Sequence, residues 1–317
     1  MKALKVYLVR FKEIFENAVS FSYVLYHIIY WLISLSLDLQ KSNISYEKKH
    51  NKYVLNWLNS KYGKLVPSNF SSSPSLYSCD CKNLPIWVCW LQGENEMPRL
   101  VRTCYKSVKR NSNGREVNFV SLKNIDSYID IPDKLKEKYN KGIIGSANYT
   151  DILRLMLLYK YGGTWIDSTI FLSGILCDSW RNPMFSSIKL NPVDKPYTIS
   201  QYRWATFYIF SCPKSPAIEC FINVLMAYWN DGFKKTIDYF LIDFIIELLY
   251  LKNDDFKECV DSTPYNQVNV YELQNKLNMI YSDNLKLFSS NTYIYKLNRR
   301  SIIKDGNTVY KYLEKIK

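Results

Sequence analysis

Asp151, Arg154 and Asp167 are the residues of this chain whose types and spacing could do chemistry. Asp151 and Arg154 stand three residues apart in a segment with helical periodicity, so both side chains share one helical face. The Gly162-Gly163 pair then permits a sharp turn into a short apolar strand that ends at Asp167. Two carboxylates and a guanidinium that converge there can bind the hydroxyls, the diphosphate and a divalent cation of a sugar nucleotide. Taken alone, each residue is typical of an ordinary surface ion pair or strand-terminal acid, so the prediction rests on their combination.

These residues are expected to lie in an α/β domain in which strands and helices alternate. The expected strands cover residues 85–90, 117–122, 164–166, 197–202 and 206–210. The expected helices cover residues 97–110, 133–139, 149–161, 216–229 and 237–251. This alternation predicts a mostly parallel central sheet with both faces covered, and such sheets bind ligands at the carboxyl ends of their strands.

The composition restricts the chemistry further. Eight cysteines occur without paired C-x-x-C spacing, which gives little support to a zinc site. The two histidines, His27 and His50, precede the central segment, so chemistry there must use carboxylates, hydroxyls, amides and arginine. The net charge of +13 predicts an anionic partner, but no nucleic-acid-binding motif accompanies it. We therefore expect a phosphorylated substrate or an acidic lipid, and no nucleic acid.

The run from Ser146 to Asp167 contains the order A-x-x-(S/T)-D-x-x-R followed by G-G-x-(W/Y)-x-D. This order resembles the capsular-polysaccharide-synthesis branch of the DXD-containing retaining glycosyltransferases (GT32-like), which is related to the yeast-type mannosyltransferases and the large clostridial toxins. The runs 85–93 and 239–243 extend the resemblance, which covers roughly residues 83–250.

The resemblance implies a GT-A-like catalytic domain that transfers a hexose, galactose or glucose, from a UDP-sugar with retention of the anomeric configuration. The implied acceptor is a capsular repeat-unit precursor on undecaprenyl diphosphate, and the implied cofactor is Mn²⁺ or Mg²⁺. The metal ligands would be Asp167, Thr169 and Asp243. Thr169 stands where the motif usually has its second acid, and a hydroxyl is a weaker ligand than a carboxylate.

The resemblance also assigns roles to residues of this chain. Asp151, Arg154 and Asp167 would be the catalytic set, and the first two would grip the donor sugar and its phosphate. The other candidates for donor binding are Trp90, Gln92, Asn148, Thr150 and Trp165. An aromatic face can stack on uracil, and an amide can read a base edge. Thr150 is a candidate for selecting between hexoses that differ at one hydroxyl.

We expect four regions along the chain. Residues 1–65 are a helical N-terminal region, 66–82 a linker, 83–295 the catalytic domain and 296–317 a basic tail or helix. Residues 17–37 carry no formal charge but have a polar stripe, which is consistent with an interfacial helix, a helix packed on the domain or a spanning helix. The basic termini favour peripheral contact with the cytoplasmic face of a bacterial membrane.

Two other functions are compatible with the same residues. A toxin-like transferase that modifies protein hydroxyls would use the same kind of donor site. A degenerate domain would bind a sugar nucleotide or a carbohydrate without turnover, an alternative raised by Thr169 in the place of the second acid. Metal-dependent hydrolysis of a UDP-sugar would separate an enzyme from a binding protein.

Overall fold

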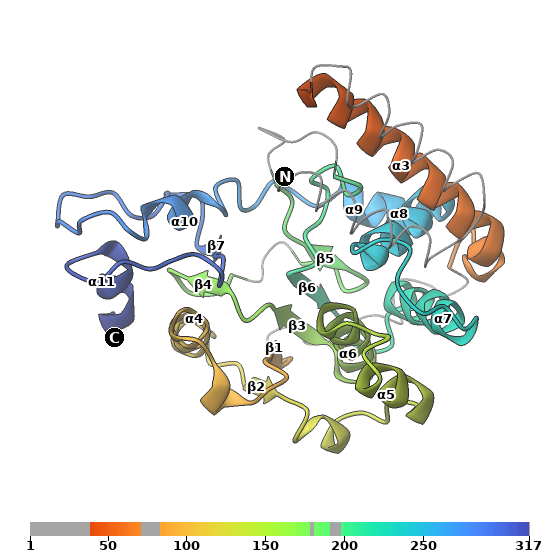
Figure 1. The fold of residues 1–317 in the computed structure, drawn as a ribbon, viewed down its shortest axis with the longest axis horizontal. Coiled ribbons are helices and arrows are strands. Elements are labelled where there is room, and N and C mark those ends of the chain that lie inside the picture. The colour runs from red at the N-terminus through yellow and green to blue at the C-terminus, as the bar shows by residue number, and fades with distance from the viewer. Residues whose placement is uncertain (1–38, 71–82, 178–180, 191–197, 317) are drawn as a thin grey trace, which may run out of the picture.

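The central sheet has five short strands in the order β2-β1-β3-β6-β5. The computed structural model in which they occur describes residues 39–70, 83–177, 181–190 and 198–316 (Figure 1). The strands are β1 (Ile86–Cys89), β2 (Val117–Val120), β3 (Gly163–Ile166), β5 (Ser186–Ser187) and β6 (Tyr208–Ser211). β1 runs parallel to β2 and β3, whereas β6 runs antiparallel to β3 and β5. β2, β1, β3 and β5 therefore point the same way, and the prediction of a mostly parallel sheet is confirmed.

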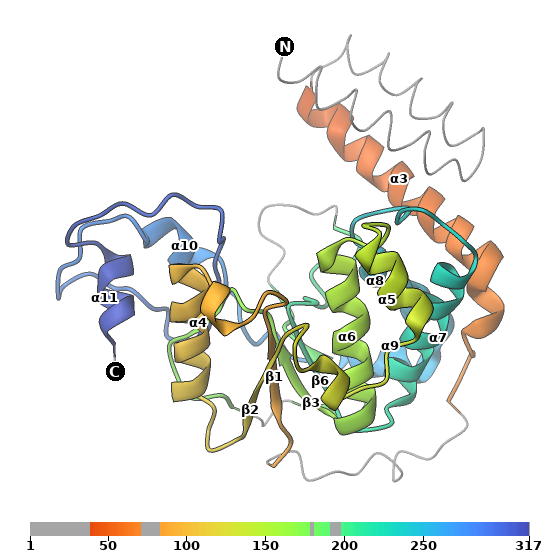
Figure 2. The same cartoon turned by 60° about the horizontal axis from the view of Figure 1, so that its bottom comes forward.

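Helices cover both faces of this sheet. The α-helices in the described residues are α3 (Leu39–Tyr62), α4 (Arg99–Arg110), α5 (Asp133–Asn140), α6 (Ser146–Tyr161), α7 (Pro216–Asn230), α8 (Leu241–Lys252), α9 (Asp254–Asp261), α10 (Glu272–Lys276) and α11 (Val309–Lys315). Short 3-10 turns occur as η1 (Gly63–Leu65), η3 (Glu94–Glu96) and η4 (Ile125–Ser127). Figure 2 shows α6 on one side of the central strands and α4 on the other.

Strand β1 shows how the two layers share one core. Its apolar sequence is buried throughout, as expected for a strand covered on both faces. Trp87 and Cys89 belong to the cluster that includes α6, α7 and α8. Ile86 and Val88 belong to the cluster that includes one face of α4. The alternation along β1 therefore divides its side chains between the two layers.

A second, smaller sheet follows the carboxyl end of β3. It pairs β4 (Ile170–Leu172) with β7 (Ile294–Lys296) in antiparallel register, and Ile170 lies opposite Lys296. Helix α11 packs beside α4 and buries Val309, Tyr310 and Leu313. The predicted boundary between residues 295 and 296 thus falls inside β7, and the C-terminal segment contributes to the folded core.

Helix α3 lies across α8, on the opposite side of the molecule from α10 and α11 (Figure 1). Val54 and Leu58 are fully buried in this contact. His50 Nε2 lies 2.9 Å from Oδ2 of Asp238, just before α8. The uncharged segment 17–37 lies outside the described residues. Within the part that the structure describes, we find no helix that is long and apolar enough to cross a membrane.

One strand predicted from the sequence is absent from the described residues, and some helices begin or end a few residues from their predicted positions. Residues 198–202, part of a predicted strand, form turns, because Gln201 and Tyr202 adopt positive φ angles of 45° and 64° that interrupt extended structure. Helix α8 begins at Leu241 rather than at residue 237. The Asp238 side chain accepts the backbone N–H of Phe240 at 2.7 Å, which forms a turn before the helix.

Candidate active site at the carboxyl end of β3

The Gly162-Gly163 turn brings Asp167 beside helix α6. Both glycines have positive φ angles, 66° and 99°. A Cβ atom on Gly163 would lie 2.1 Å from the carbonyl oxygen of Pro85, and one on Gly162 would lie 2.6 Å from Cδ of Pro213. Only glycine therefore fits at these two positions, and the turn leads directly from the end of α6 into β3.

Arg154 joins two acids at the end of that strand. Its Nη2 atom lies 2.8 Å from Oδ1 of Asp151 and 3.7 Å from Oδ1 of Asp167. Its Nη1 atom donates to the carbonyl oxygen of Thr206, and its Cζ lies 5.2 Å from the ring centre of Trp165. Asp151 and Arg154 are 7% and 6% exposed. The predicted convergence of the three residues is confirmed, while their catalytic roles stay predictions. We call them the acid–arginine cluster.

Lys296 also reaches this cluster, and sequence reasoning missed it. Its Nζ lies 2.7 Å from Oδ2 of Asp167, while Oδ1 of Asp167 accepts the indole N–H of Trp165 at 2.9 Å. In the sequence, Lys296 is one of many basic residues near the C-terminus. No local spacing could reveal its role, because the contact joins residues 129 positions apart through the pairing of β4 with β7.

Asp243, a predicted metal ligand, lies on the first turn of α8. Its Oδ1 accepts the indole N–H of Trp204 at 3.0 Å, and both residues are buried. The charge of Asp151 acts on Asp243, so the two acids belong to one electrostatic environment. Trp204 is a second residue that the sequence did not indicate. Asp243 is thus fixed by an indole donor, and its role as a metal ligand stays a prediction.

Burial and neighbouring charges separate the pKa values of the three acids. Burial raises the pKa of Asp243 to about 7, and the charge of Asp151 adds to the increase. Burial also raises the pKa of Asp151 to about 6, although the charge of Arg154 opposes it. Burial acts in the same direction on Asp167, but the charges of Lys296 and Arg154 outweigh it and lower the pKa to about 2. Near neutral pH, Asp167 is ionised, Asp151 is largely ionised, and Asp243 is close to half protonated.

Asn148 and Thr150 lie on the first turns of α6, beside the cluster. The side chain of Asn148 hydrogen-bonds Asp151 and donates to the carbonyl oxygen of Tyr239 at 3.4 Å. The hydroxyl of half-buried Thr150 donates to the carbonyl oxygen of Ser146 at 2.7 Å, within its own helix. Asn148 therefore orients Asp151, whereas Thr150 satisfies its hydroxyl locally.

Trp90 and Gln92 follow β1 at the same edge of the sheet. Trp90 is half-buried, and its indole N–H donates to the carbonyl oxygen of Glu96 at 3.2 Å. Cζ of Arg299, on the segment after β7, lies 5.7 Å from the ring centre of Trp90. Gln92 is exposed. Both residues thus lie where a ligand at this edge could reach them.

Trp165, in contrast, is 1% exposed and lies in the core with Trp87. Its indole N–H is bound to Asp167, and Arg154 lies over its ring. Trp165 therefore positions Asp167 and Arg154 in this structure, and offers little surface for stacking on a base.

The side chains around Asp167 do not fit a resident Mn²⁺ or Mg²⁺ ion. Both carboxylate oxygens of Asp167 face donor or cationic groups. Thr169 offers a hydroxyl, and the Asp243 carboxyl is hydrogen-bonded to Trp204. In residues 39–70, 83–177, 181–190 and 198–316, we find no group of three or more His, Cys, Asp or Glu side chains placed to hold a metal. Hard divalent cations take oxygen-rich ligand sets, so the metal stays a prediction that this arrangement does not favour.

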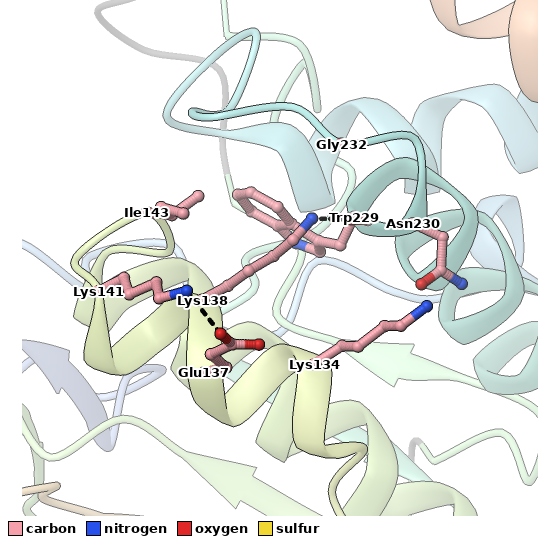
Figure 3. A pocket seen from close by; sticks show the side chains of 8 residues that line it. All are labelled: Lys134, Glu137, Lys138, Lys141, Ile143, Trp229, Asn230 and Gly232. Atoms are coloured by element: carbon pink, nitrogen blue, oxygen red, sulfur yellow. Dashed lines mark hydrogen bonds and ion pairs between the residues drawn. The ribbon is translucent and has the colours of Figure 1, made fainter.

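A separate cavity of about 320 Å³ lies between α5 and the end of α7 (Figure 3). We call it the lysine pocket, because Lys134 and Lys138 of α5 and Lys141, directly after that helix, line it together with Trp229. Lys138 donates to the carbonyl oxygen of Trp229, and Lys141 pairs with Glu137 at 2.5 Å. None of the residues predicted for the site lines this cavity.

Comparison with known protein families identifies the family to which this chain belongs. The chain belongs to the capsular polysaccharide synthesis protein family, whose model matches residues 36–316. This confirms the family-level prediction. Among solved structures, the PaToxG glycosyltransferase matches with 14% identity and a TM-score of 0.37, covering 68% of this chain and 80% of that chain. A match at this level says nothing about the substrate of this chain. No curated protein sequence matches it.

Proposed function

We propose that this chain is a glycosyltransferase with a GT-A-like fold that moves galactose or glucose from a UDP-sugar to a lipid-linked precursor of a capsular repeat unit. One observation carries the proposal: buried Asp151 and Arg154 meet the half-buried Asp167 at the carboxyl end of β3. Ligands of open α/β sheets bind at this edge. Membership of the capsular polysaccharide synthesis family supports a polysaccharide context.

The cluster has donors and acceptors suited to a sugar phosphate. Nε of Arg154 is buried and has no hydrogen-bond partner among the described residues. A buried N–H without a partner costs free energy that an oxygen of the bound donor would recover. The carboxylate of Asp151, fixed by Arg154 and Asn148, would accept from hydroxyls of the hexose. Trp90 and Gln92 would contact the uracil.

The proposed reaction retains the anomeric configuration. The bond between C1 of the hexose and the diphosphate oxygen breaks, and its electron pair stays on that oxygen. The acceptor hydroxyl oxygen bonds to C1 from the same face, and its proton passes to the departing diphosphate. The charges of buried Arg154 and half-buried Lys296 lie at the strand end where this negative charge would develop. No step in this scheme uses a covalent enzyme intermediate.

A peripheral membrane position would bring the acceptor to this edge. Ile280 and Ile302 are 80% and 86% exposed, and lie on neighbouring loops tied by a hydrogen bond of 2.8 Å from Asn278 to the carbonyl oxygen of Ile302. The exposed Arg299 and Arg300 precede Ile302 on the segment that reaches Trp90. Apolar tips flanked by cations suit the surface of an anionic bilayer. Contact at the cytoplasmic face is the orientation that we propose.

Vesicle flotation tests this part of the proposal. We expect the full chain to float with vesicles that contain an anionic lipid, and to bind vesicles of neutral lipid more weakly. The double substitution Ile280→Asn and Ile302→Asn should lower the floated fraction, whereas Ile175→Asn, at an exposed isoleucine outside these two loops, should not. Equal flotation of both variants would show that this surface is not the contact.

A panel of donors tests the reaction itself. The protein is incubated with UDP-, GDP- and dTDP-hexoses and a lipid-linked hexose mimic, and both hydrolysis and transfer are measured. Turnover of UDP-galactose or UDP-glucose that is lost in Asp167→Asn would support the proposal. Turnover of a different nucleotide sugar would mean that this sugar, and not UDP-galactose or UDP-glucose, is the donor. Binding without turnover across all donors would favour a degenerate sugar-nucleotide-binding protein, and transfer to a protein hydroxyl would favour a toxin-like enzyme.

The choice between galactose and glucose is proposed to depend on Thr150. Its hydroxyl is bound to Ser146 in this structure, so it would have to exchange that partner for a sugar hydroxyl. In Thr150→Ala, the ratio of turnover with UDP-galactose to turnover with UDP-glucose should change by several fold. An unchanged ratio would remove Thr150 from donor selection.

A further inference from the structure

Lys296 places an ammonium group at the carboxylate to which the sequence-based prediction assigns a metal ion. Its Nζ lies 2.7 Å from Oδ2 of Asp167 and 5.0 Å from the ring centre of Phe207. An ammonium group has three N–H donors, and the contact with Asp167 uses one of them. The side chain is 24% exposed, so solvent and a bound anion can reach part of it.

The backbone holds this lysine firmly in place. Lys296 is the last residue of β7 and lies opposite Ile170 in the ladder with β4. The backbone N–H of Lys296 donates to the carbonyl oxygen of Val270 at 2.8 Å, and that of Leu297 donates to the carbonyl oxygen of Thr169 at 2.9 Å. The turn that follows Asp167 and the strand that carries Lys296 are therefore parts of one hydrogen-bonded unit.

The two cationic side chains beside Asp167 disfavour the binding of a metal cation there. Asp167 lies between Lys296 and Arg154, and their charges lower its pKa to about 2 against the effect of burial. A divalent ion on this carboxylate would be repelled by both fixed cations. Thr169, in the place of the usual second acid, brings no negative charge to offset that repulsion.

We propose that Lys296, held by Asp167, supplies the positive charge that faces the diphosphate of the donor, so that donor binding and transfer proceed without a divalent metal ion. This inference rests on the proposed function. Lysine binds phosphate as a point charge. When the bond between C1 and the diphosphate oxygen breaks and the electron pair stays on that oxygen, Lys296 donates a hydrogen bond to the diphosphate and keeps its own proton. The proton of the acceptor hydroxyl still passes to the diphosphate.

Binding of UDP to the full chain, measured by calorimetry in EDTA and in Mn²⁺, tests this proposal without requiring turnover. The wild-type affinity should agree within about twofold in the two buffers. Lys296→Met, which keeps most of the side-chain length, should weaken UDP binding by about tenfold or more, and Lys296→Arg should recover most of the loss because it restores the charge. Lys141→Met removes an equal charge from the lysine pocket and should bind UDP like the wild type. Thermal unfolding checks that each variant is folded.

The outcomes separate the two proposals. UDP binding that requires Mn²⁺, or equal affinity of Lys296→Met and the wild type, would overturn the role of Lys296 and leave the transferase proposal standing. A folded wild type that binds no UDP in either buffer would overturn both. Loss of affinity in Lys296→Met together with equal loss in Lys296→Arg would assign Lys296 a structural role and would also overturn the proposal.

Discussion

The acid–arginine cluster and the lysine pocket both gather charged side chains, but they hold their charges in opposite ways. In the cluster, Asp151 and Arg154 are almost fully buried and pair with each other, and Arg154 also donates to the carbonyl oxygen of Thr206. In the lysine pocket, the side chains of Glu137 and Lys141 are each 62% exposed and pair along one helix. Exposed pairs of this kind contribute little, whereas a buried charge is costly unless it is paired.

This difference favours the acid–arginine cluster over the lysine pocket as the proposed site of the reaction. The lysine pocket is a cavity, but the carboxyl groups of Asp151, Asp167 and Asp243, whose pKa values are strongly shifted, lie outside it. A fold that buries two acids, Asp151 and Asp243, together with Arg154 forgoes stability there, which is typical of functional sites. The location of unusual buried charge is therefore a better guide to the reaction than the location of the hollow.

The largest predicted effect comes from Asp167→Asn. The amide would no longer hold Lys296 and Arg154 by charge, so the cations at the strand end would lose their alignment. We expect hexose transfer to fall by about 10²–10³-fold, measured with the donor that the wild type turns over. Circular dichroism should show an intact fold.

The matched control is Glu137→Gln, which removes one carboxylate from the lysine pocket. Its transfer rate should stay within about twofold of the wild type, because Glu137 pairs only with Lys141 at an exposed position. A comparable loss in both variants would mean that the two regions do not differ as we describe.

A smaller effect on rate and a clear effect on stability are predicted for Arg154→Lys. A lysine keeps the charge but cannot contact Asp151 and the carbonyl oxygen of Thr206 together, because it lacks the planar fork. Transfer should fall by about 10–100-fold, and the free energy of unfolding by about 1–3 kcal/mol, measured by denaturant titration.

Arg99→Lys is the control for that measurement. Arg99 pairs with Glu314 through a side chain that is 62% exposed. The free energy of unfolding of this variant should change by less than about 0.5 kcal/mol. A larger change than in Arg154→Lys would contradict the ranking of buried and exposed pairs.

The sequence predicted those parts of the cluster that depend on local spacing. Asp151 and Arg154 are neighbours on any helix, and the two glycines require a tight turn before Asp167. Lys296 and Trp204 could not be predicted in the same way. Their positions depend on the register of β7 with β4 and on the packing of α8, which arise from the whole fold.

The sheet shows the same division between local and global information. Strands β1 and β3 were predicted from continuous apolar runs, and the parallel sheet from their alternation with helices. The short strands β5 and β7 carry too few residues for a periodic signal. Residues 197–202 were predicted as a strand, but the positive φ angles of Gln201 and Tyr202 belong to a turn.

The next prediction concerns Asp243 and pH. Burial raises its pKa to about 7, so between about pH 4 and pH 7 the folded state holds a proton that the unfolded chain has released. The contribution of this group to stability therefore falls as pH rises through that window. Asp243→Asn removes the titration while an amide oxygen can still accept from Trp204.

We expect Asp243→Asn to be more stable than the wild type at pH 8 by about 1–3 kcal/mol, and close to it at about pH 4. Unfolding by urea at the two pH values measures the difference. A gain that is the same at both pH values would show that the effect does not come from titration of Asp243.

The smallest effect is predicted for the double substitution Lys134→Ser and Lys141→Ser in the lysine pocket. The two ammonium groups face a wide cavity, and Lys141 contributes only an exposed pair with Glu137. The free energy of unfolding should change by less than about 0.5 kcal/mol, and UDP binding and transfer should stay within about twofold of the wild type. This variant removes two charges, whereas Asp167→Asn removes one. If it leaves stability and transfer almost unchanged, the position of a charge matters more than the number of charges removed. A large loss of transfer would instead make the lysine pocket part of the substrate path, and the comparison would have to be redrawn with both regions in one site.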